Sequence, residues 1–477
     1  MNNYLKHLFI VQLFLAGSLV LPMSRTAASE LDTTHFRSAT IHVKPSRVIG
    51  QVKPLHGGNL AVPLVDGLYL GKVRETFRRL KIPYTRLHDV PLQNPGMRIV
   101  DIPLIFPDFR ADAEDEGAYY FDQTDDYIRD CIADSTEVYY RLGTSIEHSI
   151  KKYFVHPPKD VKKWIDVASN IIRHYTEGKW NGFRFPITYW EIWNEPDVDS
   201  QKMWTGSLDE FNAFYVEVAT ALKKRFPHLK FGGPAHCSPK EKVVRGFLSA
   251  CAEKKAPLDF YSFHCYTDDD KRIIGLPARM QQYLDEYGYH QTELHLNEWN
   301  YIYGGFWKAD AKASNDWFKV IRGAEGAAFV NTVLIGWQDT PLDVACYYTI
   351  VNLTSSRWGV FNSDGTVSKA YYGMLAFGDV AEYGNRVGLD ADLPDGSRAL
   401  AARDSHGNLA ILASCWKSGA LDLSFDIESM GEYERVEVYR LDDHSNLAKC
   451  MEVGHVQGPL KVRTDSESAI WLVKCYK

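Results

Sequence analysis

The chain has 477 residues, which is long enough to bury a large core and too long for one small domain. Its composition is that of an ordinary globular protein, with 45% hydrophobic, 24% charged and 13% aromatic residues. The formal net charge of −7 argues against a surface that binds nucleic acid or an anionic membrane.

The first 29 residues differ in character from the rest. Lys6 precedes the apolar run LFIVQLFLAGSLVLPM, and the small residues of SRTAASE follow, a pattern typical of a secretory signal peptide cleaved near Ala28 or Ser29. An uncleaved membrane anchor is the alternative, but the run of about 16 apolar residues is short for a transmembrane span. We therefore expect residues 1–29 to be a signal peptide and the mature protein to be periplasmic or extracellular, with no integral span.

Short apolar runs alternate with helical patterns over residues 50–385, which predicts β/α units and a parallel sheet. One helix is expected over 159–178, and another begins with Ser207 and Glu210 in capping-box spacing. The predicted strands are 52–59, 84–88, 137–143, 187–193, 229–233, 259–264, 293–298 and 331–337. Eight strands with connecting helices make a (β/α)8 TIM barrel, in which active sites lie at the carboxyl ends of the strands.

The pattern changes after residue 385. Short alternating strands separated by turns such as Pro-Asp-Gly and His-Gly-Asn predict an antiparallel β-sandwich over 386–477. The run SATIHVKP lies before the first barrel strand, so we expect residues 30–49 to join this sandwich. The predicted fold class is α/β, a TIM barrel at 50–385 with an accessory C-terminal antiparallel β-sandwich.

Eight cysteines are spread thinly along the chain, with no C-x-x-C pair. Disulfides are permitted in an exported protein, but the spacing fixes no connectivity, and buried unpaired thiols remain the alternative. The sequence predicts no zinc cluster, no other metal and no cofactor. It also holds no G-x-S-x-G, H-E-x-x-H, Walker A or G-x-G-x-x-G motif.

Two glutamates stand at the ends of predicted strands. Glu195 follows YWEIWN, and Glu298 ends ELHLNE, so they are 298 − 195 = 103 residues apart. A barrel of about 250 residues has roughly 31 per β/α unit, so the spacing corresponds to about three units and places the glutamates after the fourth and seventh strands. One protonated and one ionised carboxyl group facing each other is the arrangement that glycoside hydrolysis requires. Mutual repulsion and uneven solvation would separate their pKa values.

Other strand ends carry residues suited to support this chemistry. Arg86 and His88, which lie in the same predicted strand, are candidate substrate-binding or supporting residues. Arg86 could hold Glu298 ionised through a charge-assisted hydrogen bond. Asn194 could hold a sugar hydroxyl next to the reacting carbon. Taken alone, a strand-end glutamate is more often a helix cap, and an arginine such as Arg86 could equally close a structural ion pair.

Three further residues belong to the candidate site. His264 and Tyr266 offer donors to the nucleophile or the substrate, and Trp337 offers a flat apolar face to a sugar ring. A single histidine or tryptophan usually has a structural role, and Glu191 is interpreted as structural. The convergence of two acids with these supporting groups at predicted strand ends favours a catalytic site.

The sequence closely resembles glycoside hydrolase family 39, the β-xylosidase and α-L-iduronidase family of the clan A barrel glycosidases. The segments that carry the resemblance, in the order and spacing of the family, are PPKDVKKW, WEIWNEPD, FGGPA, FLSACAEKKAPLDFYSFHCYT and LNEWN. The Asn-Glu-Pro motif alone identifies the clan, and the GGPA and AEKKAPLDF stretches narrow it to the family.

The resemblance implies that Glu195 is the general acid/base and Glu298 the nucleophile, with retention through a covalent glycosyl-enzyme. Retention requires the two carboxyl groups to lie about 5 Å apart. The resemblance also implies that Asn194 lies near the 2-hydroxyl of the sugar and that His264 and Tyr266 lie in the −1 subsite. It further implies a C-terminal β-sandwich.

The chain departs from the family pattern in two places. The second strand of the family usually ends in Arg-x-His-Gly, whereas TRLHDV has Asp89 at the glycine position. The segment GWQDTPLDVACYYTIVNLTSSRWGVF does not follow the xylosidase pattern. Arg357 within it is a candidate partner for a uronate carboxylate, with a surface or fold-stabilising arginine as the alternative.

The expected function is that of a retaining exo-glycosidase that releases terminal sugars from plant or host glycans, with β-xylosidase-like specificity. The alternatives are a β-glucosidase, an α-L-iduronidase, an arabinose-releasing or disaccharide-releasing hydrolase, and a non-catalytic carbohydrate-binding barrel. The expected partner is an oligosaccharide or glycoside, and no nucleic acid.

Overall fold

The computed structural model describes residues 36–61, 73–89, 99–147, 149–199, 202–351, 357–362 and 364–477. The predicted signal peptide, residues 1–29, lies outside these ranges. Within the described part of the chain, no helix combines the length and the apolar character needed to cross a membrane.

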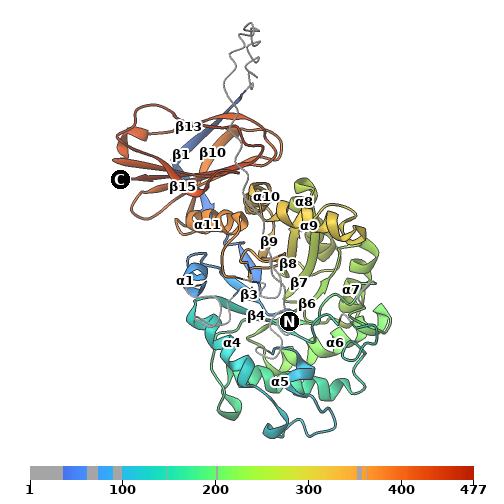
Figure 1. The fold of residues 1–477 in the computed structure, drawn as a ribbon. Helices are drawn as coiled ribbons and strands as arrows, with labels where there is room; N and C mark the ends of the chain where they lie inside the picture. Colours follow the sequence, from blue (N-terminus) through green and yellow to red (C-terminus); the bar gives the residue numbers. More distant parts are fainter. Residues whose placement is uncertain are drawn as a thin grey trace, which may run out of the picture. The chain divides into compact units, whose positions relative to one another are not determined.

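Eight parallel strands close into a barrel (Figure 1), which confirms the predicted TIM barrel. They follow one another in chain order, β2 to β9, and β9 pairs back with β2. The strands are β2 (Gly57–Asn59), β3 (Tyr84–Arg86), β4 (Glu137–Leu142), β5 (Tyr189–Ile192), β6 (Lys230–His236), β7 (Phe260–Thr267), β8 (Glu293–Tyr301) and β9 (Leu342–Tyr347). Glu195 therefore follows the fourth barrel strand, and Glu298 lies in the seventh.

Side-chain caps begin two of the helices that accompany the strands, and the one at α6 is the capping box predicted from the sequence. Asp160 accepts a hydrogen bond from the backbone of Lys163 at the start of α5, and Ser207 and Glu210 form a complete capping box at the start of α6. The described helices are α1 (Val73–Arg78), α3 (Ile102–Ile105), α4 (Asp122–Ala133), α5 (Val161–Thr176), α6 (Leu208–Arg225), α7 (Glu241–Lys254), α8 (Asp270–Glu286), α9 (Ala311–Ile321), α10 (Ala324–Gly336) and α11 (Lys369–Ala381).

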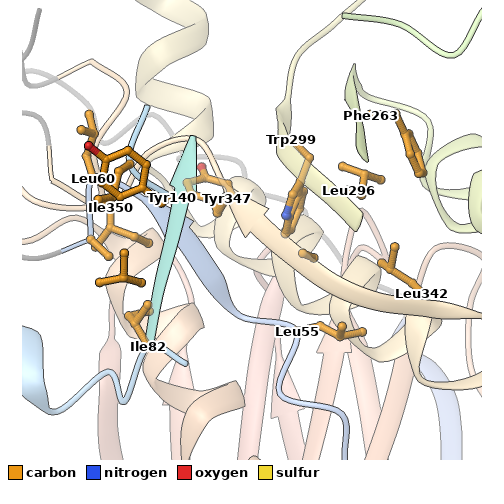
Figure 2. Close-up of a cluster of buried hydrophobic side chains, with 14 of the residues drawn as sticks. Leu55, Leu60, Ile82, Tyr140, Phe263, Leu296, Trp299, Leu342, Tyr347 and Ile350 are labelled. Carbon is orange, nitrogen blue, oxygen red and sulfur yellow. The ribbon is translucent and has the colours of Figure 1, made fainter. Parts of the chain in front are cut away.

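Along each barrel strand, successive side chains point alternately into the barrel and outward to the surrounding helices. Figure 2 shows Phe263, Leu296 and Trp299 among the buried hydrophobic side chains of the large core. Tyr189 and Phe260 belong instead to a separate small apolar cluster inside the barrel. Residues two positions apart along a strand share one face, so the residues that follow Tyr189 and Phe260 at this spacing also point inward. They bring polar side chains into the barrel near the carboxyl ends of the strands.

The prediction of a strand at 331–337 is wrong. Residues 324–336 form α10, and the eighth barrel strand is β9, at 342–347. Helix α10 contacts barrel strand β8 and also strands β11 and β12 of the C-terminal sheet, so its residues are buried on nearly every side. A helix that is apolar all round has no amphipathic period, and a short window of it resembles a buried strand.

The C-terminal strands form one continuous nine-stranded sheet in the order β15-β14-β17-β12-β11-β10-β1-β13-β16. These strands are β1 (Arg37–Gln51), β10 (Asn385–Asp392), β11 (Arg398–Arg403), β12 (Leu409–Cys415), β13 (Leu421–Ile427), β14 (Arg435–Leu441), β15 (Asn446–Gly454), β16 (Leu460–Thr464) and β17 (Ala469–Tyr476). Strand β1 runs antiparallel to β10 and parallel to β13, so the sheet is mixed. Ile41, Ile411, Phe425 and Trp471 share one buried core, which means that the sheet curls around its own apolar face.

The cysteines contribute to these cores. Cys251, Cys265, Cys346, Cys415 and Cys475 are buried, unpaired thiols. Burial raises their pKa values, so they behave as small apolar side chains.

Candidate active site

Glu195 stands on a tight turn directly after β5. Its φ is +45° and that of Trp193 is +75°, a region that residues other than glycine rarely adopt. Three hydrogen bonds hold this turn: Glu195 N–H donates to the Ala235 carbonyl at 2.9 Å, Trp193 N–H to the Leu142 carbonyl at 2.8 Å, and the Trp193 indole to the Met203 carbonyl at 2.8 Å. The turn therefore fixes where the Glu195 carboxyl group points. Strained backbone of this kind persists where the surroundings over-determine it.

Arg86, at the end of β3, joins the residues beneath the site. Its guanidinium donates to Glu298 Oε1 at 2.8 Å, to Glu191 Oε2 at 2.7 Å and to Asn194 Oδ1 at 2.7 Å. The bond to Oδ1 fixes the orientation of the Asn194 amide, so Nδ2 is directed away from Arg86. That Nδ2 is buried and has no hydrogen-bond partner among the described residues, so it is available to a substrate hydroxyl.

Glu298, within β8, is held by two donors. Arg86 donates to Oε1, and the Tyr266 hydroxyl donates to Oε2 at 2.7 Å. Burial raises the pKa of Glu298, while His264 and Arg86 oppose the rise. Two strong donors on one carboxylate favour its ionised form, as a nucleophile requires.

Glu195 has a different environment. Burial, together with the charges of Asp197 and Asp89, raises its pKa to about 8, against the opposing effect of Arg86. Its Oε1 lies 2.7 Å from Nδ1 of His264, whose own pKa is lowered by burial. At pH 7 Glu195 therefore carries a proton, and the two acids differ in protonation as an acid and a nucleophile must.

The two carboxyl groups lie close together. Glu195, His264 and Glu298 each present an oxygen or nitrogen atom, and these three atoms lie within 4.8 Å of one another. Retaining glycosidases place their carboxyl groups about 5–5.5 Å apart, and inverting ones about 6.5–9.5 Å apart. A closest approach of the two carboxyl groups below 4.8 Å fits the retaining class.

The same three atoms have a spacing that one cation could bridge. However, the Arg86 guanidinium, 2.8 Å from Glu298, already supplies a positive charge at this point, and Nδ1 of His264 is directed at Glu195. The donor set therefore fits a proton-transfer site better than a metal centre.

His88 follows β3 and has a fixed tautomer. Arg141 donates from Nε to Nδ1 of His88 at 3.1 Å, so the ring proton lies on Nε2. Burial and the positive charges of Arg86 and Arg141 lower the pKa of His88, which keeps the ring neutral. Its Nε2 lies 3.1 Å from Asp89 Oδ1 and 3.8 Å from Glu298 Oε1.

Trp337 does not belong to the site, and its prediction as a sugar platform is wrong. It begins the 3₁₀ helix η4 (Trp337–Asp339) and is fully buried. Its indole nitrogen donates to the Ile273 carbonyl at 3.2 Å, and its ring packs edge-on against Trp299 at 4.9 Å. The error follows from the misplaced eighth strand, because a residue at a true strand end would have faced the pocket.

Aromatic side chains that the sequence analysis missed lie beside Tyr266 instead. Trp307, in the 3₁₀ helix η3 (Phe306–Lys308) after β8, is 66% exposed and meets the Tyr266 ring edge-on at 5.7 Å. Trp358 stacks on Trp307 with ring centres 5.9 Å apart, and Tyr348 meets Tyr266 at 6.3 Å. Tyr348 directly follows β9, and because the sequence pattern does not indicate that strand, it does not indicate Tyr348 as a site residue either.

Glu191 has more contacts to the site than its position in the sequence indicates. It pairs with Arg86, as a structural residue would, and it is fully buried inside the barrel. Arg86 links it to Glu298. Glu191 Oε1 accepts hydrogen bonds from Ser262 at 2.6 Å and from Asn297 at 2.5 Å. The signal that could have found it is its spacing of two from Tyr189, which shares its face of β5.

Comparison with known proteins identifies the family. Residues 99–355, more than half of the chain, match Glycosyl hydrolases family 39. The chain therefore belongs to glycosyl hydrolase family 39, as the resemblance implied.

The curated relatives match over shorter segments. The chain is 36% identical over 114 residues to a beta-xylosidase of Geobacillus stearothermophilus, covering 24% of this chain and 22% of that protein. It is 24% identical over 213 residues to a beta-xylosidase of Caldicellulosiruptor saccharolyticus, covering 42% and 40%. The matches thus span only about a fifth to two fifths of the length of these relatives.

Solved structures share the fold across nearly the whole chain. A glucosidase from Croceicoccus marinus has a TM-score of 0.77 at 21% identity, covering 93% of this chain and all of that one. The GH39 enzyme from Xanthomonas axonopodis pv. citri has a TM-score of 0.69 at 17% identity, covering 94% and 99%. At such identities the likeness concerns the fold alone.

Proposed function

We propose that this family 39 protein is a retaining exo-glycosidase that releases a neutral terminal sugar, with β-xylosidase-like specificity. The observation that carries the proposal is the pair Glu195 and Glu298, close together but held by different partners. The names of two curated relatives, both beta-xylosidases, favour xylose over other sugars.

The reaction proceeds in two displacements. Glu298 attacks the anomeric carbon while Glu195 donates its proton to the glycosidic oxygen, which leaves with the rest of the substrate. Glu195, now ionised, then takes a proton from water as that water attacks the anomeric carbon, which breaks the bond to Glu298 and frees the sugar. Arg86 and Tyr266 hold Glu298 in place, and Asn194 Nδ2 donates to a hydroxyl of the bound sugar.

The test compares the wild type with Glu298→Gln, Glu195→Gln and the control Glu293→Gln on 4-nitrophenyl β-xyloside. Glu293 lies in the same strand as Glu298 but at its opposite end, where it pairs with Lys230. We expect a loss of at least about 1,000-fold for Glu298→Gln and near wild-type turnover for Glu293→Gln. Unchanged turnover in Glu298→Gln, or a product of inverted configuration by NMR, would overturn the mechanism.

The sugar is tested separately, with aryl glycosides of xylose, glucose, arabinose, galactose and iduronate. We expect the highest kcat/KM with the β-xyloside. Arg357, the candidate uronate partner, is exposed, and its guanidinium carbon lies 6.0 Å from the ring centre of Phe318. A preference for the iduronide would refute the xylosidase assignment and leave the retaining mechanism in place.

We also propose that the protein is exported. Support comes from the charged start, apolar run and small residues of positions 1–29. Expression of the full chain with its leader should yield an exported protein whose N-terminus, by mass spectrometry, lies near residue 29. An intact leader on a protein retained in the cytoplasm would contradict export.

A further inference from the structure

Two polar groups beside the nucleophile have no role in the reaction derived so far. His88 Nε2 carries a proton, is buried and makes no well-directed hydrogen bond to the described residues. It lies 3.1 Å from Asp89 Oδ1 and 3.8 Å from Glu298 Oε1. A buried donor without a proper acceptor costs free energy unless a ligand supplies that acceptor.

Asp89, the residue after His88, has a defined backbone conformation and fixed side-chain partners. Its φ of +57° is one that aspartate tolerates better than most residues. Oδ2 accepts a hydrogen bond from the Tyr348 hydroxyl at 2.8 Å, and Oδ1 accepts one from the Ile146 backbone at 3.2 Å. The loops after β3, β4 and β9 thus hold one carboxylate in a single orientation, and Oδ1 retains capacity for a second donor.

The exposure of Asp89 matches that of the nucleophile. Its side chain is 3% exposed and that of Glu298 is 6% exposed, and both carboxylates have an oxygen within 3.8 Å of His88 Nε2. Asp89 is also near enough for its charge to raise the pKa values of both Glu195 and Glu298. Its charge helps keep Glu195 protonated, but beside the ionised Glu298 it adds repulsion that a ligand group donating to Asp89 would offset.

We propose that Asp89 and His88 bind one ring hydroxyl of the terminal sugar between them, the hydroxyl donating to Asp89 Oδ1 and accepting from His88 Nε2. This assignment rests on the glycosidase function proposed above. A single hydroxyl would supply an acceptor for His88 Nε2 and a donor for Asp89 Oδ1, because a hydroxyl both donates and accepts hydrogen bonds. Asn194 follows β5 and Asp89 follows β3, two barrel strands away, so we expect Asn194 to serve a different hydroxyl of the sugar.

The experiment pairs a change in the protein with a change in the substrate. kcat/KM is measured for the wild type and for Asp89→Asn on the aryl β-xyloside and on its 3-deoxy and 4-deoxy analogues. Asparagine keeps the size of the side chain and tolerates a positive φ, but it loses the charge. A hydrogen bond to a charged group predicts that the wild type loses about 10- to 100-fold on one of the deoxy substrates.

In Asp89→Asn the penalty for that same deoxy substrate should shrink to a few-fold, because the partner of the missing hydroxyl has been weakened. Asp197→Asn is the matched control, since it makes the same chemical change at another buried aspartate near Glu195. It should lower activity and keep the full deoxy penalty. Asp89→Gly, which also tolerates the backbone conformation, serves if the asparagine variant does not fold.

An equal deoxy penalty in the wild type and in the folded Asp89 variant would overturn the inference. So would a wild type that hydrolyses both deoxy substrates as well as the parent. Either result would leave the proposed glycosidase function intact, whereas absence of turnover by the wild type on every glycoside tested would refute that function itself.

Discussion

Arg86 is the residue on which the electrostatics of the site depend. Its fully buried guanidinium donates to two carboxylates, Glu191 in β5 and Glu298 in β8. It also donates to the amide oxygens of Asn59 in β2 and Asn194 after β5. The two carboxylates that it contacts, Glu191 and Glu298, are the charges that most strongly raise its own pKa. Glu195 has no hydrogen bond to Arg86, and this difference separates the protonated acid from the ionised nucleophile.

Asp197 should set the alkaline limit of activity. Among charged groups it contributes most to the raised pKa of Glu195, about 8, and its Oδ1 is fixed by the Cys237 backbone at 2.8 Å. Glu195 must be protonated to assist departure of the leaving group, so kcat/KM should fall as the pH rises above about 8. Asp197→Asn removes a negative charge, stabilises the ionised form of Glu195, and should move this limb of the profile to lower pH.

The measurement is the pH dependence of kcat/KM on xylobiose. Repeating it on 2,4-dinitrophenyl β-xyloside supplies the control, because a good leaving group needs little help from the acid and the alkaline limb should weaken in both proteins. An alkaline limb on xylobiose that does not move in Asp197→Asn would contradict the role of Asp197.

The two acids could be predicted from the sequence because each ends a recognisable apolar run, and the two runs are three β/α units apart. The contact between Asp89 and Tyr348 could not be predicted, because it joins loops 259 positions apart in the chain. Such contacts depend on barrel closure and on where β9 ends, and neither leaves a local pattern in the sequence.

At the scale of elements, α10 is the helix that the apolar pattern of the sequence does not identify. Seven barrel strands were found from apolar runs, because they are bounded by turns and followed by amphipathic helices. Helix α10 has neither signal, since the barrel and the C-terminal sheet both cover it. The short β9, which follows it after the 3₁₀ helix η4, was therefore missed.

Trp337→Ala tests the corrected position of this tryptophan. Removal of a fully buried indole that packs on Trp299 should lower the free energy of unfolding by about 3–5 kcal/mol, through lost burial and an unfilled cavity. KM for the aryl xyloside, measured below the lowered melting temperature, should stay near the wild-type value. A large rise in KM with unchanged stability would place Trp337 in the sugar pocket after all.

Trp307→Ala should show the opposite behaviour. This ring is largely exposed, with one side stacked on Trp358 and its edge toward Tyr266, which contacts the nucleophile. If it stacks on the sugar of the leaving group, its loss should cost about 1–2 kcal/mol of binding and raise KM for xylobiose roughly 5- to 30-fold. The melting temperature should change little, and an unchanged KM would show that the ring does not contact substrate.

At the scale of the whole described chain, the barrel and the C-terminal sheet share buried structure. The Ser414 hydroxyl of β12 donates to the Ala328 carbonyl of α10 at 2.7 Å, and the Thr332 hydroxyl donates to the Gly396 carbonyl at 2.9 Å. Lys474 of β17 pairs with Asp379 of α11 at 2.7 Å. Strand β1 enters the sheet before the chain forms the first barrel strand, so both ends of the described chain lie in the sheet.

These contacts predict that the two parts unfold together. Loss of the sheet would expose the apolar surface of α10, and loss of the barrel would leave α10 and β1 without their anchors, so neither part is expected to persist alone. We expect one calorimetric transition, at the temperature where xyloside hydrolysis is lost. Truncation after residue 384 should give an insoluble or unfolded chain even though every residue of the site remains. Two resolved transitions, or a soluble and active truncated barrel, would show that the sheet is an independent domain.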